Sequence, residues 1–539
     1  MLLDYQMITR ESKNDNFKKV CIPTAGIGSR LGDFTVDINK SLIDIDNKAI
    51  ISYIIEKFPK KTEFIIPLGF KGNLVKQYLK LAHPKIKFIF VNVKKFKGKG
   101  SGLGHSILCA KKYLNEPFIF ISCDTLIRNK INLKKNNWVG YSDFGDPKKY
   151  RGIKVNKGNV HFFLEKNFKK KKDNKIYIGI AGIKNYKTFW KLMENNKKKS
   201  IPSGEVFGLS NLQTRIKARK FKWLDAGNTV DYLKIKKKIK SKKNILEKGG
   251  EKIWFVENKV IKYFKDKSLI SKRVKRASIL KKFVPKIIEH KKNMYSYRME
   301  EGKVFSEVKS NKVFINLLSH IKRFHKTTHQ VNKKKYDKIC EIFYKKKTTQ
   351  RIIDFEKKFK IKDSCASLNS VKTRKIRDIL KLINWKDLVR GKYSNFHGDL
   401  HFENILYSRK NKKFIFLDWR QDFGGNLKYG DIYYDLAKLM HGLIVSHKQV
   451  QNNNYKINWR KKNINFSIKS EKIYKKYIFN YKKWILKNNF DLQRINILTG
   501  LIYLNIAALH HYPYSLFLYA AGKKILTDIV LYKKNDIEL

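Results

Sequence analysis

Hydrophobic positions in the first half of the chain follow two alternating periods. From Val20 onward, short apolar runs alternate with segments whose apolar residues recur every three to four positions. The first pattern is typical of buried strands and the second of amphipathic helices. Strand–helix alternation at this spacing predicts an α/β domain with a doubly wound, mostly parallel sheet over residues 17–240. The clearest expected strands are 19–23, 63–68 and 87–93, and the clearest helices are 51–58 and 73–81.

The second half begins after a change in composition. Residues 234–250 are rich in lysine, weakly patterned and end in two glycines, which indicates a boundary between domains. Beyond it, residues 252–256 and 259–264 predict a β-hairpin, and the chain is mainly helical from about residue 312. We therefore expect a second domain, of α+β class, over residues 250–539.

No segment has the pattern of a membrane span or a signal peptide. The most apolar stretch, residues 497–521, is interrupted by His510, His511 and Pro513, so it predicts a pair of buried helices. Charged residues break up any apolar run near the N-terminus. The five cysteines form no CxxC pair and no metal-ligand spacing. We expect reduced thiols in a cytoplasmic protein.

The charge of the chain is extreme. Its 120 Lys and Arg against 45 Asp and Glu give a formal net charge of +75. Because such a surface attracts polyanions, a basic polyanion-binding protein with degenerate enzyme folds is one alternative. The lysines are spread along the whole chain, however, and abundant Ile and Asn beside them indicate codon bias from an AT-rich genome. We expect no specific nucleic-acid partner, although the positive field would steer phosphorylated substrates inward.

A glycine-rich loop follows the first expected strand, with the sequence Thr24-Ala25-Gly26-Ile27-Gly28-Ser29-Arg30-Leu31-Gly32. Glycines here let backbone N–H groups approach a phosphate chain, and an arginine adds a fork of donors for phosphate oxygens. The loop lacks the ending of a Walker A motif, and Leu31 stands at the third glycine position of the dinucleotide motif. Gly26, Gly28 and Arg30 are therefore candidates for gripping a triphosphate.

Two aspartates and a lysine accompany this loop. Asp124 ends the apolar run 118–123, Asp225 stands before a tight turn, and Lys40 follows the loop. With the loop, they resemble the sugar-phosphate nucleotidyltransferases, including phosphocholine cytidylyltransferase-like members, over residues 17–240. The resemblance implies that Asp124 and Asp225 hold the catalytic magnesium and that Lys40 stabilises charge on the nucleotide phosphates. Asn39 stands where the family has a proline before that lysine.

The same resemblance assigns further residues to the substrates. Gly102, in the glycine-rich segment 98–104, would help to cradle the base and ribose, although the segment is equally compatible with a flexible helix entry. Lys166, after Glu165, would neutralise the phosphate of the acceptor. Glu205 would either touch the acceptor or be exposed. The run 177–183 corresponds to the strand that borders the acceptor pocket.

The second half carries its own pattern for phosphoryl transfer. His397-Gly398-Asp399-Leu400-His401-Phe402-Glu403-Asn404 is followed by an apolar strand that ends in Asp418. Asp399 can accept a proton from a substrate hydroxyl, while Asn404 and Asp418 offer hard oxygen ligands for magnesium. These residues resemble the aminoglycoside phosphotransferase and choline kinase family. That resemblance implies a protein-kinase-like fold and the phosphorylation of a small molecule.

Other parts of this half have supporting roles in the resemblance. Lys262, on the expected strand 259–264, corresponds to the lysine that grips the α- and β-phosphates of ATP, but the helix expected at 269–283 contains no Glu to pair with it. Residues 295–300 resemble the strand and hinge that hold adenine. We expect Asp431 to cap a helix, Asp435 to be structural, His397 to orient the loop and His401 to face solvent.

The two halves together predict a bifunctional enzyme with Mg²⁺ as its cofactor. The kinase would phosphorylate a small alcohol or sugar with ATP. The nucleotidyltransferase would then join that phosphate to a nucleotide from a second NTP, CTP or UTP, to make an activated donor for a surface polysaccharide or lipid head group. A choline-like alcohol and a sugar are both open as acceptors. A further alternative is that only one of the two domains is catalytic.

Overall fold

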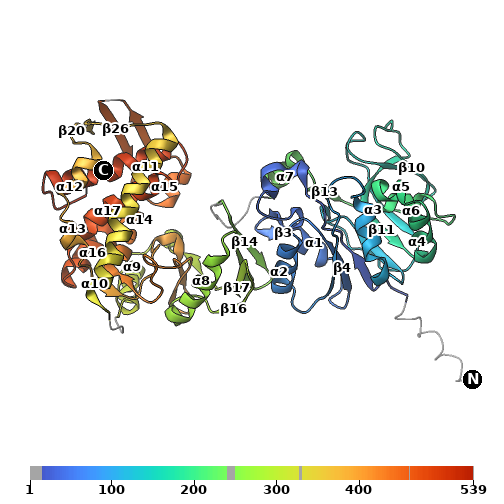
Figure 1. Cartoon of the computed structure of the whole chain (residues 1–539), viewed down its shortest axis with the longest axis horizontal. Coiled ribbons are helices and arrows are strands. Elements are labelled where there is room, and N and C mark those ends of the chain that lie inside the picture. The colour runs from blue at the N-terminus through green and yellow to red at the C-terminus, as the bar shows by residue number, and fades with distance from the viewer. Residues whose placement is uncertain (1–14, 240–248, 327–330, 461, 538) are drawn as a thin grey trace, which may run out of the picture. The chain divides into compact units, whose positions relative to one another are not determined.

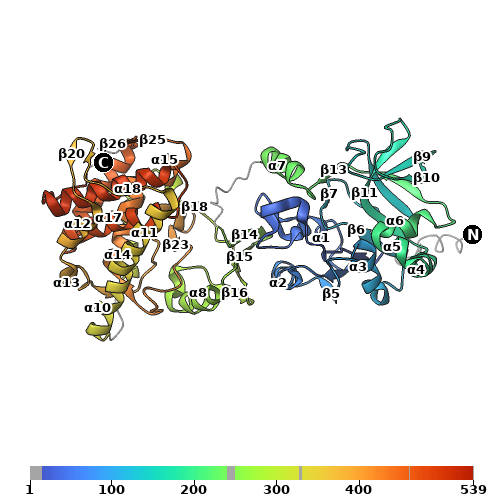
Figure 2. The same cartoon turned by 45° about the horizontal axis from the view of Figure 1, so that its top comes forward.

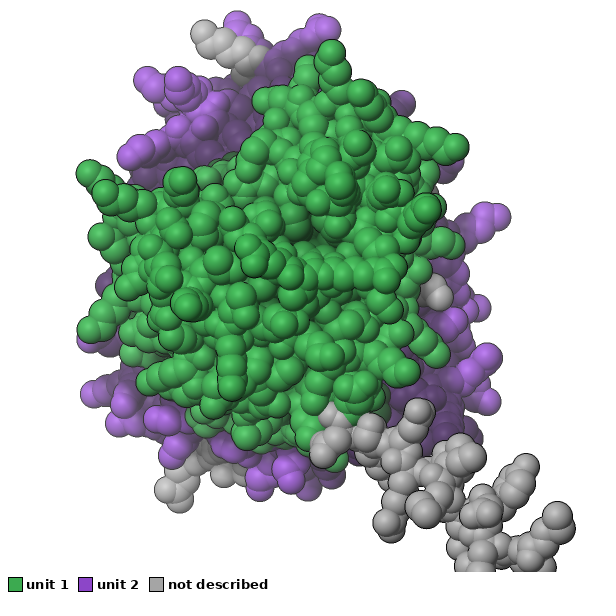
Figure 3. Space-filling model, turned by 90° about the vertical axis from the view of Figure 1, so that its right-hand side faces the viewer, with its two compact units in different colours: residues 1–267, 288–297 green, residues 268–287, 298–539 purple. Residues whose placement is uncertain are grey.

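The computed structural model describes residues 15–239, 249–326, 331–460, 462–537 and 539. These residues divide into two compact units (Figure 3). Unit 1 comprises residues 1–267 and 288–297, and unit 2 comprises residues 268–287 and 298–539. Most of the boundary predicted at 240–250 lies outside the described residues.

Unit 1 contains the predicted α/β domain, built on a nine-stranded sheet (Figure 1). The strand order is β5-β4-β1-β6-β11-β8-β12-β10-β9. The first four of these strands are parallel, and β11 then runs antiparallel to both β6 and β8. The α/β class is confirmed. The strands are β1 (Lys19–Cys21), β4 (Glu63–Leu68), β5 (Lys87–Asn92), β6 (Phe118–Ile121), β8 (Trp138–Ser142), β9 (Gly152–Asn156), β10 (Asn159–Leu164), β11 (Asn174–Ile183) and β12 (Lys217–Lys220).

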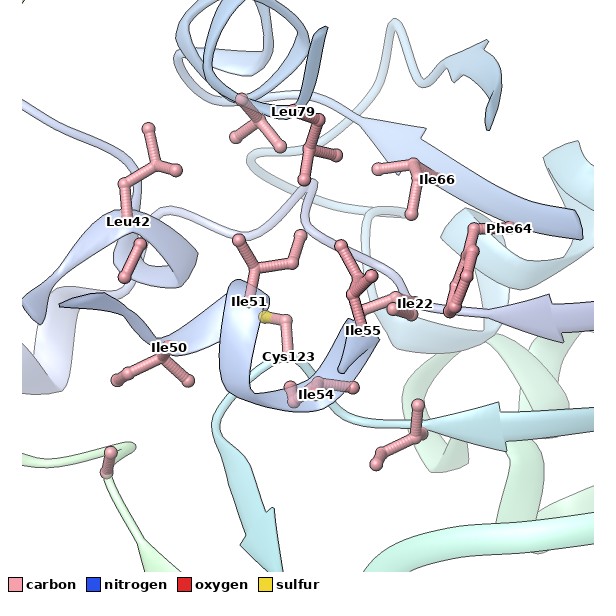
Figure 4. Packing of buried hydrophobic residues seen from close by; sticks show 14 of the residues in the cluster. Ile22, Leu42, Ile50, Ile51, Ile54, Ile55, Phe64, Ile66, Leu79 and Cys123 are labelled. Atoms are coloured by element: carbon pink, nitrogen blue, oxygen red, sulfur yellow. The ribbon is translucent and has the colours of Figure 1, made fainter. Parts of the chain in front are cut away.

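Helices cover both faces of the parallel part of this sheet. Successive side chains of a strand point to opposite faces, so Phe64 and Ile66 of β4 join one apolar cluster while Ile65 joins another. Figure 4 shows the first cluster, in which α1 places Ile51 and Ile55 close to Cys123, the residue before Asp124. The helices of the unit are α1 (Ile50–Ile55), α2 (Gly72–Ala82), α3 (Leu103–Ala110), α4 (Tyr186–Asn195), α5 (Lys197–Ser203), α6 (Glu205–Ser210) and α7 (Thr229–Lys238).

The predicted hairpin after the boundary is present, but it packs with unit 1. Strands β14 (Glu251–Val256) and β15 (Lys259–Phe264) pair antiparallel, in a four-stranded sheet with β17 (Met294–Arg298) and β16 (Ile287–His290). Trp254 is buried and donates from Nε1 to Leu42 O at 3.0 Å. The Tyr263 hydroxyl donates to Asp37 O at 3.0 Å. The start of the predicted second domain therefore shares a core with the first domain.

Unit 2 is mainly helical, as the pattern predicts (Figure 2). The expected buried helix pair is present as α17 and α18. A Cβ added to Gly522 of α18 would come within 2.8 Å of Gly500 O of α17, so small residues let the two helices approach closely. No helix in the described part of the chain has the length and apolar character needed to cross a membrane. The helices are α8 (Lys267–Leu280), α9 (Asn311–Phe324), α10 (Lys333–Glu341), α11 (Lys347–Phe359), α12 (Ile376–Leu382), α13 (Trp385–Leu388), α14 (Ile432–Ile444), α15 (His447–Gln451), α16 (Lys472–Lys487), α17 (Leu492–Ala507) and α18 (Tyr514–Leu526).

Short strands complete unit 2 and position its loops. The hairpin of β22 (Ile405–Ser408) and β23 (Lys413–Phe416) carries the predicted metal ligands at its ends, and β18 (Lys303–Val304) pairs with β22. The segment before the catalytic motif pairs with the start of α14 through β21 (Tyr393–Ser394) and β24 (Gly430–Asp431). A separate sheet contains β19 (Ser367–Leu368), β20 (Val371–Lys372), β25 (Tyr455–Trp459) and β26 (Asn463–Ile468).

Candidate functional site

The glycine-rich loop of unit 1 leaves the carboxyl end of β1, where ligands of open α/β sheets bind. Gly26 is exposed, and a Cβ added there would meet no atom within 4 Å. Gly28 has a φ of +76°, and a Cβ there would lie 2.9 Å from the Cβ of Lys40. Gly28 is therefore required both by the left-handed backbone and by the close approach of Lys40.

Lys40 and Asp124 form an ion pair in the structure. Lys40 Nζ lies 2.8 Å from Asp124 Oδ2, and both side chains are largely buried. Burial works against ionisation of both groups, but their mutual attraction outweighs it, so the pKa of Lys40 is raised and that of Asp124 is lowered. The positive charge of Arg30, an exposed residue, also lowers the pKa of Asp124. The fold thus brings together Arg30, Lys40 and Asp124.

Asp225 reaches the same place through strand pairing. Strand β13 (Trp223–Asp225) runs antiparallel to β7 (Thr125–Ile127), and Asp225 lies opposite Thr125, the residue after Asp124. A Cβ added to Gly227 would lie 2.9 Å from Asp124 Oδ2 and 3.0 Å from Asp225 Oδ1. The two carboxylates therefore converge over Gly227, as a shared metal site requires.

The carboxylate of Asp225 is held firmly. Gly227 N donates to Oδ1 at 3.0 Å, Asn228 Nδ2 donates to Oδ2 at 3.1 Å, and the Tyr150 hydroxyl donates to Oδ2. Burial and the nearby negative charge of Asp124 nevertheless raise the pKa of Asp225. A bound divalent cation would relieve this repulsion, so the donor set suits Mg²⁺. Among the described residues no group of three or more His, Cys, Asp or Glu could hold a metal.

Asn39 has a function that sequence reasoning missed. Its side chain is fully buried, and Nδ2 donates to Thr24 O at 2.9 Å and to Phe70 O at 2.7 Å. Its Oδ1 accepts hydrogen bonds from the backbone N and the hydroxyl of Ser41. Asn39 thereby caps the short 3-10 helix Lys40–Leu42. Asn39 therefore ties the phosphate loop to the segment that carries Lys40, at the position where related sequences have proline.

The residues predicted for the base and the acceptor have varied surroundings. Gly102 has a φ of +155°, and a Cβ there would lie 2.6 Å from Ile201 O, so helix packing already requires a glycine. Lys166 is exposed after β10, and Glu165 pairs with Arg151 at 3.0 Å. Glu205 is buried rather than exposed. It accepts from the Tyr177 hydroxyl at 2.9 Å, and burial raises its pKa to about 7.

In unit 2 the motif around Asp399 forms a compact centre. Asn404 Nδ2 lies 3.1 Å from Asp399 Oδ2, and Lys438 Nζ of α14 lies 2.8 Å from Asp399 Oδ1. The side-chain contacts of Asn404 with other described residues use Nδ2, so its Oδ1 is left to ligate a metal. Leu417 N donates to Asn404 O at 2.7 Å, which places Asp418 beside this loop. Asp418 has a φ of +57°, and its carboxylate lies 3.8 Å from Arg273.

The loop that carries Asp399 is anchored from the core. Asp435 accepts from His397 N at 2.6 Å and from Gly398 N at 2.7 Å. Burial raises the pKa of Asp435 to about 7 and lowers that of His397 to about 3. His397 Nε2 lies 2.7 Å from Leu417 O, so the neutral ring bridges the loop and the segment before Asp418. His397 and Asp435 therefore have the positioning roles predicted for them.

Arg276 is a second support that the sequence did not reveal. It lies on α8, the helix that lacks the expected Glu, and its side chain is fully buried. Its guanidinium donates to Arg420 O at 2.9 Å, to Leu427 O at 3.1 Å and to Phe396 O. It also lies over the ring of Phe396 at 3.6 Å. Arg276 thus fixes both ends of the segment that contains Asp418.

Asp431, His401 and Lys262 were also assigned places from the sequence. Asp431 caps α14, as predicted, by accepting from Tyr433 N at 3.1 Å. The expectation that His401 faces solvent is wrong, because its ring lies between Asp399 and Glu403 and their charges raise its pKa to about 9 against the opposing effect of burial. Lys262 is buried on β15 in unit 1, whereas Asp399 lies in unit 2. Its role in gripping ATP stays a prediction.

Comparisons with known proteins agree with this division of the chain. Residues 353–453 match the model of the phosphotransferase enzyme family, whose short name is APH. The N-terminal part is similar to the bifunctional protein GlmU of Methanocaldococcus jannaschii, with 29% identity over 249 residues, 44% of this chain and 57% of that protein. GlmU of Methanococcus maripaludis strain C7 is 29% identical over 243 residues, 42% of this chain and 56% of that protein. The chain thus spans little more than half the length of these curated relatives.

Solved structures with similar folds were also found. A UDP-glucose pyrophosphorylase complexed with UDP-glucose is 21% identical, with a TM-score of 0.36, and covers 41% of this chain and 98% of its own. The CTP:phosphocholine cytidylyltransferase of Streptococcus pneumoniae is 15% identical, with a TM-score of 0.35, and covers 41% of this chain and 99% of its own. The chain therefore combines a region that resembles sugar-phosphate nucleotidyltransferases with a region that resembles aminoglycoside phosphotransferases.

Proposed function

We propose that this chain is a bifunctional enzyme in which unit 2 phosphorylates a small hydroxylated molecule with ATP and unit 1 joins the resulting phosphate to a nucleotide. The observation that carries the proposal is the presence of two sets of candidate metal ligands and proton acceptors, one per unit. Asp124 and Asp225 converge over Gly227, and Asp399 contacts Asn404 beside Asp418. A degenerate fold kept only for binding would have no reason to retain both sets.

The first reaction would be phosphoryl transfer at Asp399. The hydroxyl oxygen of the acceptor attacks the γ-phosphorus of ATP, the bond to the bridging oxygen breaks, and ADP leaves. The hydroxyl proton goes to the carboxylate of Asp399, which the contacts to Asn404 and Lys438 hold in place. Asn404 and Asp418 would hold magnesium, which when bound neutralises charge on the phosphate oxygens.

A recess within unit 2 is suited to the adenine of ATP. It is lined by Leu406 and Ile415 on the hairpin of β22 and β23 and by Glu300, which follows the predicted hinge strand. Leu406 and Ile415 pair across the hairpin, so their side chains would pack against one face of the flat base, and the backbone after the hinge strand would offer donors and acceptors for its edge. Leu406 stands two residues after Asn404, so this recess lies near the predicted metal ligands.

The second reaction would be nucleotidyl transfer at Asp124. A phosphate oxygen of the phosphorylated acceptor attacks the α-phosphorus of the second NTP, CTP or UTP, and pyrophosphate leaves as the bond to its bridging oxygen breaks. Gly26, Gly28 and Arg30 would grip the triphosphate, and Asp124 with Asp225 would hold magnesium. Lys40 is placed to exchange its contact with Asp124 for one with the phosphates as charge develops there. Gly102 would approach the base, and Lys166 would neutralise the acceptor phosphate.

The experiment that tests the proposal is ³¹P NMR of the purified chain with Mg²⁺, ATP, CTP, UTP and a panel of sugars and alcohols. We expect a new phosphomonoester signal, followed by the paired signals of a diphosphodiester and by pyrophosphate. The NTP that is consumed identifies the nucleotide of the product, which we propose to be an activated donor for a surface polysaccharide or a lipid head group. Stable ATP, CTP and UTP across the whole panel would contradict the proposal.

A further inference from the structure

A group of cationic side chains surrounds Asp399 on one side of its carboxylate. Asp399 Oδ2 faces Asn404, the predicted metal ligand, whereas Oδ1 faces Lys438. Lys438 lies one turn after Tyr434 on α14. Lys347 is the first residue of α11, and its Nζ lies 5.7 Å from the centroid of the Tyr434 ring. Lys347 therefore lies near the same part of α14 as Lys438, and the charge of Asp399 acts on both.

Lys347 and Arg420 share one aromatic ring. Lys347 Nζ lies 4.2 Å from the centroid of Phe343, and the guanidinium of Arg420 lies 5.0 Å from the same centroid. Phe343 is fixed by stacking on Phe423 at 4.2 Å and by an edge contact with Tyr434 at 4.8 Å. The ring of Phe343 is therefore covered by positive charges of the protein itself.

Lys347 and Arg420 are cations without an ion-pair partner among the described residues. In the described part of the chain, neither Lys347 nor Arg420 forms an ion pair with a carboxylate, and Arg420 Nε is buried without a hydrogen-bond partner. Burial and the charges of Arg420, Lys438 and Arg351 together lower the pKa of Lys347 well below its ordinary value, although the charge of Asp399 acts in the opposite direction. Cations crowded in this way are costly unless an anion joins them. Both side chains are partly exposed, so an anion from solvent can reach them.

We propose that the phosphotransferase centre takes a hydroxylated acceptor that already carries an anionic group, a carboxylate or a phosphate, and that Lys347 and Arg420 bind this group. The inference rests on the proposed function and names its substrate class. It disfavours a choline-like acceptor, because a quaternary ammonium needs a free aromatic face and Lys347 and Arg420 already occupy that of Phe343. It favours an acidic sugar or hydroxy acid, whose hydroxyl would lie at Asp399 while its anion lies at Arg420.

The test measures ADP release by the full chain with Mg²⁺, ATP and matched pairs of acceptors. The pairs are glucose with glucuronate, glycerol with glycerate, and glucose with glucose 6-phosphate, and choline serves as the cationic probe. We expect kcat/KM to be about tenfold or more higher for an anionic member than for its neutral partner, as charge-assisted hydrogen bonds predict. The carboxylate and phosphate pairs identify which anion is preferred. Preference for the neutral member or for choline would overturn the inference.

Two variants connect this preference to the residues. Lys347→Gln and Arg420→Gln should each raise the KM of the anionic acceptor about tenfold or more, with the KM of ATP unchanged within about twofold. Lys347→Arg, which keeps the charge, should restore most of the loss. Lys346→Gln is the matched control, because Lys346 is exposed on the preceding residue and should behave as the wild type. An anion preference that survives in both Gln variants would contradict the assignment.

A binding measurement separates this inference from the proposed function. Saturation-transfer difference NMR without ATP compares glucuronate, glucose 6-phosphate, glucose and choline on the wild type and on Lys347→Gln. We expect signals from an anionic probe that weaken in the variant. If no acceptor supports ADP release, the phosphotransferase function fails, and the binding comparison alone still decides whether this site selects anions. Equal or stronger signals from glucose or choline would overturn the inference.

Discussion

The two candidate centres are built in opposite ways. In unit 1, Lys40, Asp124 and Asp225 come from distant parts of the sequence. Lys40 pairs with Asp124, and the pairing of β7 with β13 lets the carboxylates of Asp124 and Asp225 converge over Gly227. In unit 2, Asp399, Asn404 and Asp418 lie within twenty residues, and their loops are held by buried residues outside this set, namely Asp435, His397 and Arg276. The first centre depends on strand pairing between distant segments, and the second is a local sequence motif that buried side chains hold in position.

This difference matters for how each centre would fail. If a supporting side chain such as Arg276 is lost, Asp399 and Asn404 would no longer be held in the correct positions. In unit 1, the comparable support is Asn39, which joins the phosphate loop to the segment of Lys40. The centres differ in charge as well, because Lys40 pairs with one of two converging carboxylates in the first, whereas in the second Lys438 pairs with Asp399 and two further cations, Lys347 and Arg420, lie together at Phe343.

The largest expected effect separates the two chemistries. Asp399→Asn should lower ADP release by about three orders of magnitude, because it removes the proton acceptor, and should leave pyrophosphate release unchanged. Asp124→Asn should lower pyrophosphate release by a similar factor and leave ADP release unchanged, because it removes a metal ligand. Each product is measured with the substrates of its own reaction. Loss of both activities in a folded single variant would contradict the two-centre account.

Removal of the buried support in unit 2 should have the next largest effect. Arg276→Met leaves three carbonyl oxygens without their donor and should lower the free energy of unfolding of unit 2 by about 5 kcal/mol. Denaturant unfolding followed together with ADP release would show the loss. Lys275→Met is the matched control on the same helix, because Lys275 is exposed. Equal free energies of unfolding for the two variants would show that Arg276 does not stabilise unit 2.

The corresponding test in unit 1 is Asn39→Ala. It abolishes two donated and two accepted hydrogen bonds of a buried side chain and should cost about 4 kcal/mol. Pyrophosphate release should fall with it, since Lys40 loses its cap, while ADP release persists. Asn73→Ala, at an exposed position of α2, is the control and should change neither quantity. A fully active Asn39→Ala enzyme would show that the cap is dispensable.

The smallest effect concerns pH. Burial raises the pKa of Glu205 to about 7, above its ordinary value of 4.5, so the folded state binds this proton more tightly than the unfolded state. The protonated Glu205 carboxyl therefore makes its full contribution to the free energy of unfolding below pH 4.5. This contribution, about 3 kcal/mol, is lost as the pH rises to 7. Glu205→Gln should unfold at the same denaturant concentration as the wild type at pH 4.5 but at a higher one at pH 8. The exposed Glu165→Gln variant should show no such difference.

Much of the second centre was predictable because its information is local. Asp399, Asn404 and Asp418 lie in a short motif with an apolar strand, and the ends of β22 and β23 place them as expected. In unit 1, strand ends predicted the position of Asp124, whereas the convergence with Asp225 depends on a strand pair about a hundred residues apart. The roles of Asp431, Asp435 and His397 followed from their place beside a helix start and the loop.

The features that escaped prediction depend on contacts between distant segments. Arg276 contacts residues 120 and more positions away, and Lys347 and Arg420 meet at Phe343 only after folding. In a chain with 120 basic residues, no pattern distinguishes these few from the solvated majority. The packing of Trp254 against Leu42 likewise crosses the boundary that composition indicated.

The central claim is that two separate centres act in sequence, and a complementation experiment tests it most directly. Asp124→Asn and Asp399→Asn are each incubated with Mg²⁺, ATP, CTP, UTP and the acceptor that supports ADP release, first alone and then mixed, and followed by ³¹P NMR. We predict that Asp124→Asn alone accumulates the phosphomonoester, that Asp399→Asn alone makes no new phosphomonoester, and that the mixture makes the diphosphodiester. A mixture that makes no diphosphodiester, although both variants are folded, would contradict the claim.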